Sequence, residues 1–266
     1  MNKYNFKKYI SELLDLCEDV GNFQLKEQKN LNVNIKADNS PVTNVDLYSS
    51  EMIVEYLTNN FPNDVVISEE SEQKLILNNS YWLVDPIDGT KNYISGGNQF
   101  CICISYISNG YPVFGIIYVP SSKEFYYAIK GQGCYLKVEG TENIKISNDN
   151  KTLSNIFVSS TIRSSVIEIL NKNFINSELV FMSSAVKFVR VAEGKGHFSI
   201  RLGPTHEWDT AAGQCIIEES GGLFLDKNLQ RFSYGLGNNF LNGPFFIVNG
   251  DLEMHREAIN QCLSLI

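Results

Sequence analysis

Apolar residues in the first 140 positions follow two different periods. Recurrence every three to four residues predicts one helix over 5–28 and a second over 43–60, whose apolar stripe is expected to contain Leu47, Ile53, Val54 and Leu57. Short apolar runs bounded by turn residues predict strands over 64–67, 81–84, 100–107, 113–119 and 124–129, with 133–138 extending an antiparallel meander. The polar stretch 30–43 is expected to form a loop or a loose hairpin.

After residue 155, short apolar runs alternate with helical patterns. Strands are predicted over 156–159, 179–181, 197–201, 222–225 and 245–249, and helices over 164–173, 185–193, 210–219 and 252–263. The polar stretch 139–155 is the expected boundary between an N-terminal lobe, residues 1–140, and a C-terminal lobe, residues 141–266. This alternation predicts an α/β fold of two layered lobes with a site between them.

The run Asp85-Pro86-Ile87-Asp88-Gly89-Thr90 directly follows the apolar stretch 81–84. Because Pro86 cannot donate a ladder hydrogen bond and fixes φ, we expect the strand to end and the chain to turn there. The turn would bring the carboxylates of Asp85 and Asp88 together, and Gly89 and Thr90 would open a helix whose amides receive a phosphate. A turn with capping acids and no ligand is the alternative.

Charge and composition exclude several classes of protein. The 266 residues carry a net charge of −8 and contain no basic block, so a nucleic acid polymer is not the expected partner. The six cysteines include no Cys-x-x-Cys pair and there are only three histidines, so buried free thiols are favoured over a zinc site. No secretory signal or membrane-spanning run is seen, which predicts a soluble cytoplasmic protein; association with a membrane surface stays open.

Four acids lie at predicted strand ends or helix starts: Glu69, Asp85, Asp88 and Asp209. Carboxylates of this number suit Mg²⁺ ions that share a bridging ligand and hold a phosphate between them. Each acid alone has an ordinary explanation: Asp209 lies at the N-cap or in the first turn of a predicted helix, and acids in loops are common. A fifth acid, Asp46, lies in the first turn of the helix over 43–60, where it complements the helix dipole. The set as a whole favours phosphoryl transfer.

Three segments resemble the inositol monophosphatase superfamily of Mg²⁺-dependent, lithium-sensitive phosphatases. They are Ser68-Glu-Glu70, Trp82-Leu-Val-Asp-Pro-Ile-Asp-Gly-Thr90 and Trp208-Asp-Thr-Ala-Ala-Gly213, with Glu219-Ser-Gly-Gly222 behind them. Within it the chain is most similar to bacterial 3'(2'),5'-bisphosphate nucleotidases, through 36–43, 88–91, 183–188 and 201–205. The resemblance implies a layered α-β-α-β-α sandwich and hydrolysis of 3'-phosphoadenosine 5'-phosphate to AMP and phosphate.

The resemblance also implies a role for each matching residue. Two or three Mg²⁺ ions would be held by Glu69, Asp85, Asp88, Asp209 and the Ile87 carbonyl. Thr90, oriented by Asp46, would activate the attacking water together with Glu69. The substrate would contact Gly89, Thr90, Ser184, Lys187, Arg201 and Asp209, where the Arg201 guanidinium suits a second phosphate.

Two residues depart from the nucleotidase pattern. Asn92 matches the inositol-phosphatase version of the central motif, and Ile162 stands near a position where many nucleotidases carry a histidine that contacts the base. Hydrolysis of inositol monophosphate or a sugar bisphosphate, or a sensor or scaffold without turnover, remain the alternatives. Arg201 and Lys187 as plain surface charges, the Lys36 loop as a lid, and a monomer or a homodimer also stay open.

Overall fold

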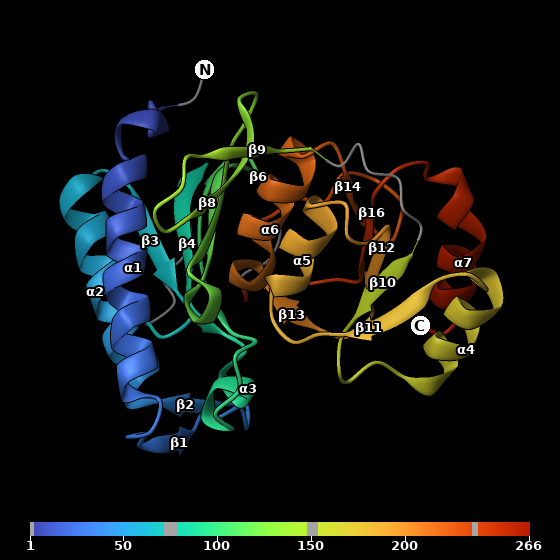
Figure 1. Cartoon of the computed structure of the whole chain (residues 1–266), viewed down its shortest axis with the longest axis horizontal. Helices are drawn as coiled ribbons and strands as arrows, with labels where there is room; N and C mark the ends of the chain where they lie inside the picture. The colour runs from blue at the N-terminus through green and yellow to red at the C-terminus, as the bar shows by residue number, and fades with distance from the viewer. Residues whose placement is uncertain (1–2, 72–78, 148–153, 236–238) are drawn as a thin grey trace.

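The fold stacks helices and sheets in five layers, and its computed structural model describes residues 3–71, 79–147, 154–235 and 239–266. The first layer contains α1 (Ile10–Glu27) and α2 (Asn44–Asn60), and the middle layer contains α5 (Val186–Ala192) and α6 (Glu207–Glu219). The last layer contains α4 (Ser164–Asn173) and α7 (Glu253–Leu263). A sheet lies on each side of the middle layer, so the expected α-β-α-β-α sandwich is confirmed (Figure 1).

The first sheet has seven strands in the order β3-β4-β5-β6-β7-β8-β9. β3 and β4 are parallel and every later pair is antiparallel, which confirms the expected meander. The strands are β3 (Val65–Ser68), β4 (Ser80–Asp88), β5 (Cys101–Ser108), β6 (Tyr111–Val119), β7 (Glu124–Ile129), β8 (Gly133–Val138) and β9 (Ile144–Ile146).

The second sheet has five strands in the order β11-β10-β12-β16-β14. β10 is parallel to β11 and β12, whereas β16 is antiparallel to β12 and β14. The strands are β10 (Asn155–Val158), β11 (Glu178–Phe181), β12 (Phe198–Arg201), β14 (Leu223–Asp226) and β16 (Phe245–Val248). Two small pairs complete the described strands: the hairpin of β1 (Val33–Ile35) with β2 (Pro41–Thr43), and β13 (Thr205–His206) with β15 (Leu241–Asn242).

Several predicted boundaries were wrong. β4 does not end at Val84 but continues through Pro86 to Asp88, because a register shift between Asp85 and Asp88 absorbs the proline. Leu47 is 48% exposed, since α2 turns a partly polar face inward. The first helix is preceded by a separate 3₁₀ turn, Phe6–Lys8. α6 begins at Glu207 rather than at residue 210.

The polar stretch 139–155 contains a strand that its composition did not predict. β9 pairs with β8 and so extends the first sheet beyond residue 140. Residues 148–153 of the expected boundary lie outside the described part of the chain. The division into two lobes stays a prediction.

Three apolar clusters fill the spaces between the layers. One lies between α1, α2 and the first sheet, one surrounds the middle layer, and one lies between the second sheet and the outer helices. Close packing in the middle layer depends on glycine, because a Cβ on Gly213 would meet the Phe188 ring at 2.2 Å. Within the described residues, no helix combines the length and the apolar character that crossing a membrane requires.

Candidate metal centre and phosphate pocket

The end of β4 carries two acids on either side of a bulge. Asp85 pairs with Cys103 and Asp88 with Cys101, so two residues of β4, Pro86 and Ile87, stand opposite one residue of β5, Ile102. In a regular strand, residues three apart point to opposite faces, and the extra residue removes that constraint. The Gln24 side chain donates to the Pro86 carbonyl at 2.8 Å and holds the bulge from α1. Both acids are thereby held at one edge of the sheet, as expected for ligand sites in α/β folds.

Three carboxylates from three different elements converge at this edge. Glu69 follows β3, Asp85 lies on β4, and Asp209 is the third residue of α6; their ligand oxygens lie within 4.8 Å of one another. Asp85 is 1% exposed. Burial raises the pKa of its carboxyl well above the usual range, and the charges of Glu69 and Asp88 add to the effect. Burial and the charge of Asp88 raise the pKa of Asp209 to about 8.

Asp88 does not belong to that group of three. Its Oδ2 accepts a hydrogen bond from the Ala185 amide and lies 3.9 Å from the Cys101 Sγ. Burial raises its pKa, while the charge of Lys187 acts in the opposite direction. The predicted set therefore lies at one site, but Asp88 faces the second half of the chain while the others face one another.

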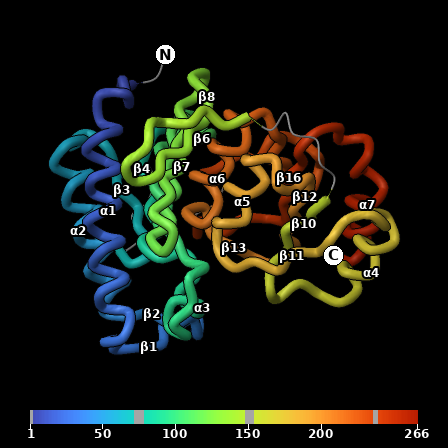
Figure 2. The backbone as a smooth tube through the Cα atoms, in the orientation of Figure 1, coloured from blue at the N-terminus to red at the C-terminus, as the bar shows by residue number. Residues whose placement is uncertain are grey.

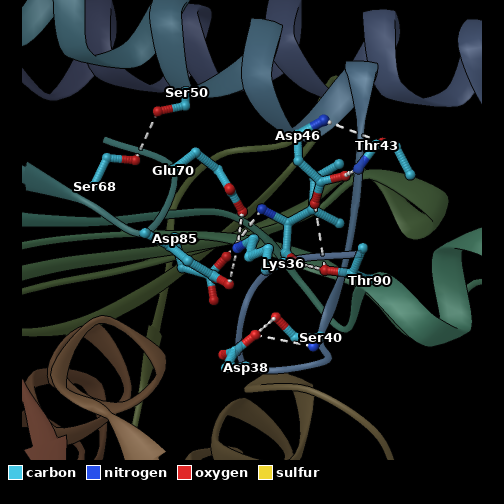
Figure 3. A network of polar contacts seen from close by, with 12 residues as sticks. Lys36, Asp38, Ser40, Thr43, Asp46, Ser50, Ser68, Glu70, Asp85 and Thr90 are labelled. Carbon is cyan, nitrogen blue, oxygen red and sulfur yellow. Dashed lines mark hydrogen bonds and ion pairs between the residues drawn. The ribbon is translucent and has the colours of Figure 1, made fainter. Parts of the chain in front are cut away.

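Asp46 links the start of α2 to Thr90, which follows the β4 bulge (Figure 3). Its Oδ2 accepts from the Thr43 amide at 2.9 Å and from the Thr43 hydroxyl at 2.5 Å, in a capping box. Its Oδ1 accepts from the Thr90 hydroxyl at 3.3 Å, and that hydroxyl is also 3.1 Å from the Ile87 carbonyl. The predicted contact of Asp46 with Thr90 is confirmed, and burial raises the pKa of Asp46.

The polar hairpin over 30–43 brings an ammonium group to the acids. Lys36 Nζ lies 2.7 Å from Glu69 and 2.6 Å from Glu70, reaching across from the β1–β2 turn (Figure 3). Burial raises the pKa of Glu70 to about 7, although Lys36 opposes the shift. The hairpin itself lies beside α3 (Thr90–Ile94) in the backbone trace (Figure 2). The loose hairpin is confirmed, and its action as a lid stays a prediction.

A cavity of about 150 Å³ opens beside Asp88 and Asp209. It is also lined by Ser184, Lys187 and Arg201, so with Asp209 the structure brings four of the six predicted substrate residues to one cavity, while Gly89 and Thr90 are not part of its lining. Lys187 Nζ donates to the Ser184 carbonyl at 2.6 Å, and burial lowers the pKa of Lys187. The two cations face an acidic edge across a cavity, which excludes the interpretation of Lys187 as a plain surface charge.

Arg201 lines the cavity and is held there by two hydrogen bonds. Its Nη1 donates to Ser159 Oγ at 3.0 Å and its Nη2 to the Pro204 carbonyl at 3.3 Å. Its buried Nε has no hydrogen-bond partner within the described residues. Arginine presents its donors in a planar fork, so a phosphate in the cavity would find them already oriented.

Gly89 must be glycine where it joins β4 to α3. Its φ is +99°, and a Cβ there would lie 2.8 Å from the Gln99 carbonyl oxygen and 3.2 Å from Ser184 Cβ. The Ser184 side chain, which lines the cavity, therefore lies close to the backbone of Gly89.

The donors of this edge fit Mg²⁺. All three clustered groups offer hard carboxylate oxygens, which Mg²⁺ prefers. Burial first, and repulsion from neighbouring carboxylates second, raise the pKa values of Asp85 and Asp209. A divalent cation would remove that repulsion. Glu69, Asp85 and Asp209 are therefore the residues that would hold it, with Asp88 at the side of the cavity.

Comparison with known proteins decides the family. Residues 8–260 match the model of the inositol monophosphatase family. The chain belongs to the inositol monophosphatase family. A 3'(2'),5'-bisphosphate nucleotidase CysQ of Aggregatibacter actinomycetemcomitans is 33% identical over 89% of this chain and 91% of its own length.

Solved structures of the inositol monophosphatase family share the fold. CysQ of Bacteroides thetaiotaomicron superimposes with a TM-score of 0.77 at 29% identity, over 94% of this chain and 100% of that one. An IMPase of Thermotoga maritima superimposes with a TM-score of 0.78 over 97% of each chain, and at 24% identity this likeness concerns the fold alone.

Some residues at the site were given no role in the sequence analysis, because they lie far along the chain from the acidic motifs. Ser159 and Thr205 both line the cavity. Ser159 belongs to no motif used above, and Thr205 lies in the segment 201–205 but was given no role. Glu70 was quoted in a motif without a role, yet it binds Lys36. The departure at Asn92 has a structural cause, because its Oδ1 accepts from the Gln99 amide at 2.8 Å. Ile162 lines a neighbouring cavity that shares Arg201 and Ser159 with the first.

Proposed function

We propose that the protein is a Mg²⁺-dependent phosphatase that hydrolyses the 3'-phosphate of 3'-phosphoadenosine 5'-phosphate to give AMP and phosphate. The observation that carries the proposal is the cavity in which Lys187 and Arg201 face the acidic edge formed with Asp88 and Asp209. Acids that hold cations suit the phosphate that is cleaved, and a second phosphate suits the arginine fork. The names of the CysQ relatives support the same substrate class.

The chain's own groups would bind and orient the substrate. The amides of Gly89 and Thr90 receive the scissile phosphate, while Arg201 and Lys187 receive the other phosphate. Ser184 and Asp209 close the cavity around the sugar. Enzymes of the family use Mg²⁺, and we propose two or three ions at Glu69, Asp85, Asp88, Asp209 and the Ile87 carbonyl. Bound Mg²⁺ supplies charge neutralisation and a more acidic water molecule.

Proton transfer would run through Thr90 and Asp46. The Thr90 hydroxyl oxygen takes the proton of the attacking water and passes its own proton to Asp46 Oδ1, 3.3 Å away. Glu69 acts beside them as a second acceptor. The bond from water oxygen to phosphorus forms as the bond to the nucleoside 3'-oxygen breaks, and that oxygen takes a proton from water. No covalent enzyme intermediate is required.

The test is phosphate release from 3'-phosphoadenosine 5'-phosphate, inositol 1-phosphate and fructose 1,6-bisphosphate, each with Mg²⁺ and with EDTA. Fast release from the nucleotide that EDTA abolishes is the expected result. Preference for inositol phosphate or the sugar would keep the metal centre and discard the role of Arg201. No release from any of the three would favour a nucleotide or metal sensor, or a scaffold.

A further inference from the structure

Two free thiols lie directly behind Asp88. Cys101 and Cys103 stand two residues apart on β5 and therefore share a face, with their Sγ atoms 3.9 Å apart. Cys101 Sγ is also 3.9 Å from Asp88 Oδ2, and the three ligand atoms lie within 4.8 Å of one another. Neither thiol has a part in the proposed hydrolysis. The sequence did not predict this group of three, because Asp88 is 13 residues from Cys101 and comes next to it only through the pairing of β4 with β5.

The distances match those of a soft metal ion. A tetrahedral ion with metal–sulfur bonds of about 2.3 Å places two sulfurs about 3.8 Å apart. With a metal–oxygen bond of about 2.1 Å, the oxygen lies about 3.6 Å from each sulfur. The two separations that involve Cys101 Sγ are 3.9 Å each and exceed these values by about 0.1–0.3 Å, and the third, between Cys103 and Asp88, lies within 4.8 Å. Small side-chain rotations would close the difference.

The donor atoms differ in kind from those of the carboxylate cluster. Thiolate sulfur selects ions such as Zn²⁺ and Cd²⁺, whereas carboxylate oxygen alone suits Mg²⁺. We infer that Asp88, Cys101 and Cys103 form a second binding site, for one thiophilic divalent cation, that shares Asp88 with the catalytic edge. Binding exchanges two thiol protons for the metal ion: the two S–H bonds break, two metal–sulfur bonds form, and both protons pass to solvent.

The shared residue makes the second site inhibitory, a consequence that rests on the proposed function. Asp88 Oδ2 already accepts from the Ala185 amide, whose loop carries Ser184 and begins α5. A cation bound between the thiols draws this oxygen away from the cavity and weakens its bond to the amide. Asp88 also lines the cavity, so a cation held by the thiols would act on a group of the proposed catalytic edge. Both catalytic metal binding and the position of the Ser184 loop would change.

Cd²⁺ is the probe, because its bond to thiolate sulfur gives an ultraviolet charge-transfer absorption that needs no enzymatic activity. The full-length chain, freed of metal and reductant, is titrated as wild type, Cys103→Ser, Cys103→Ala and Cys17→Ser. Cys17 is a matched control, since it is also a buried free thiol but lies on α1 in the outer layer. Circular dichroism confirms that each variant folds.

The expected result is a band that saturates at one Cd²⁺ per chain in the wild type and in Cys17→Ser. Both Cys103 variants should bind at least tenfold more weakly. Absence of the band in the wild type, or an equal band in the Cys103 variants, would overturn the site.

The inhibitory role is tested on phosphate release with saturating Mg²⁺, where each variant is compared with its own rate without Cd²⁺. The concentration of Cd²⁺ that halves the rate should rise at least tenfold in Cys103→Ser and stay at the wild-type value in Cys17→Ser. Equal inhibition in all variants would assign the effect to the carboxylate cluster and overturn the inhibitory role. Failure of the proposed function would appear as no phosphate release at all, while the absorption titration would still decide the site.

Discussion

Replacing Arg201 with alanine tests how the pocket selects a second phosphate. The side chain is fixed by Ser159 and Pro204, its Nε has no partner within the described residues, and the charge lies beside Lys187 in one cavity. A charge-assisted hydrogen bond contributes about 1.5–3 kcal/mol, and a fork makes two. Because part of this binding free energy only replaces hydrogen bonds to water, we take the lower limit for the two bonds together, about 3 kcal/mol, as the contribution of Arg201 to phosphate binding.

A loss of about 3 kcal/mol corresponds to a rise of roughly 100-fold in KM for the bisphosphate, since 1.4 kcal/mol is tenfold. Inositol 1-phosphate has no second phosphate, so its KM should change less than about threefold by the same reasoning. Arg201→Lys keeps the charge but not the fork and should lie between wild type and alanine.

The assay measures phosphate release from both substrates over a range of concentrations at fixed Mg²⁺. Arg256→Ala is the matched control, because it removes one arginine from the surface of α7 and should leave both KM values at wild type. Equal increases in KM for both substrates would refute the second-phosphate role and reduce Arg201 to a structural support for the cavity.

Three further predictions concern the metal centre and the turn beside it. Asp88→Asn should abolish turnover and weaken Mg²⁺ binding in calorimetry, and unchanged turnover would remove Asp88 from the metal ligands. The pKa values of Asp209 and Glu70 are raised to about 8 and about 7 in the folded protein, whereas both carboxyl groups ionise near pH 4 in the unfolded chain. Their contribution to stability is therefore fully present below about pH 4 and is lost as the pH rises through the folded pKa values. Stability of the metal-free protein should therefore fall as pH rises from about 4 to about 8. The Mg²⁺-induced increase in Tm should be larger at pH 8 than at pH 5, and an equal increase at both would contradict this account. Gly89→Ala should cost about 1–3 kcal/mol in urea unfolding, because φ is +99° and a carbonyl lies 2.8 Å from the new Cβ. Gly243→Ala, which meets nothing within 4 Å, is its control, and equal costs would show that the turn is not strained.

The layered fold and the acidic edge were predictable because local patterns carry them. Apolar periods located the strands and helices to within a few residues, and Asp85 and Asp88 stood out as acids beside an apolar run. The bulge was not predictable from propensity, since Pro86 forbids a regular ladder and the Gln24 contact that stabilises the bulge comes from a distant helix. Tertiary structure overrode the local signal there.

Polar contacts between distant segments account for the features of the site that the sequence did not predict. α2 was expected to bury Leu47, but its inward face instead carries Asp46 and Ser50, which bind Thr90 and Ser68. The amphipathic rule fails on the helix face that serves the site. Lys36 likewise reaches Glu69 from 33 residues away, a contact that the surrounding sequence gives no means to anticipate.

The close approach of Gly213 to the Phe188 ring connects the packing of the middle layer with the geometry of the site. Gly213 lies one turn after Asp209 on α6, and Phe188 lies next to Lys187 on α5 and lines the cavity. The distance between Asp209, the proposed metal ligand, and Lys187, the proposed substrate cation, is therefore set by how closely two helices pack. Enlarging either partner would widen the space between reacting and recognised groups without altering any of them. Substrate preference in such a scaffold can change through its interior, and a search for its determinants should include positions that no substrate touches.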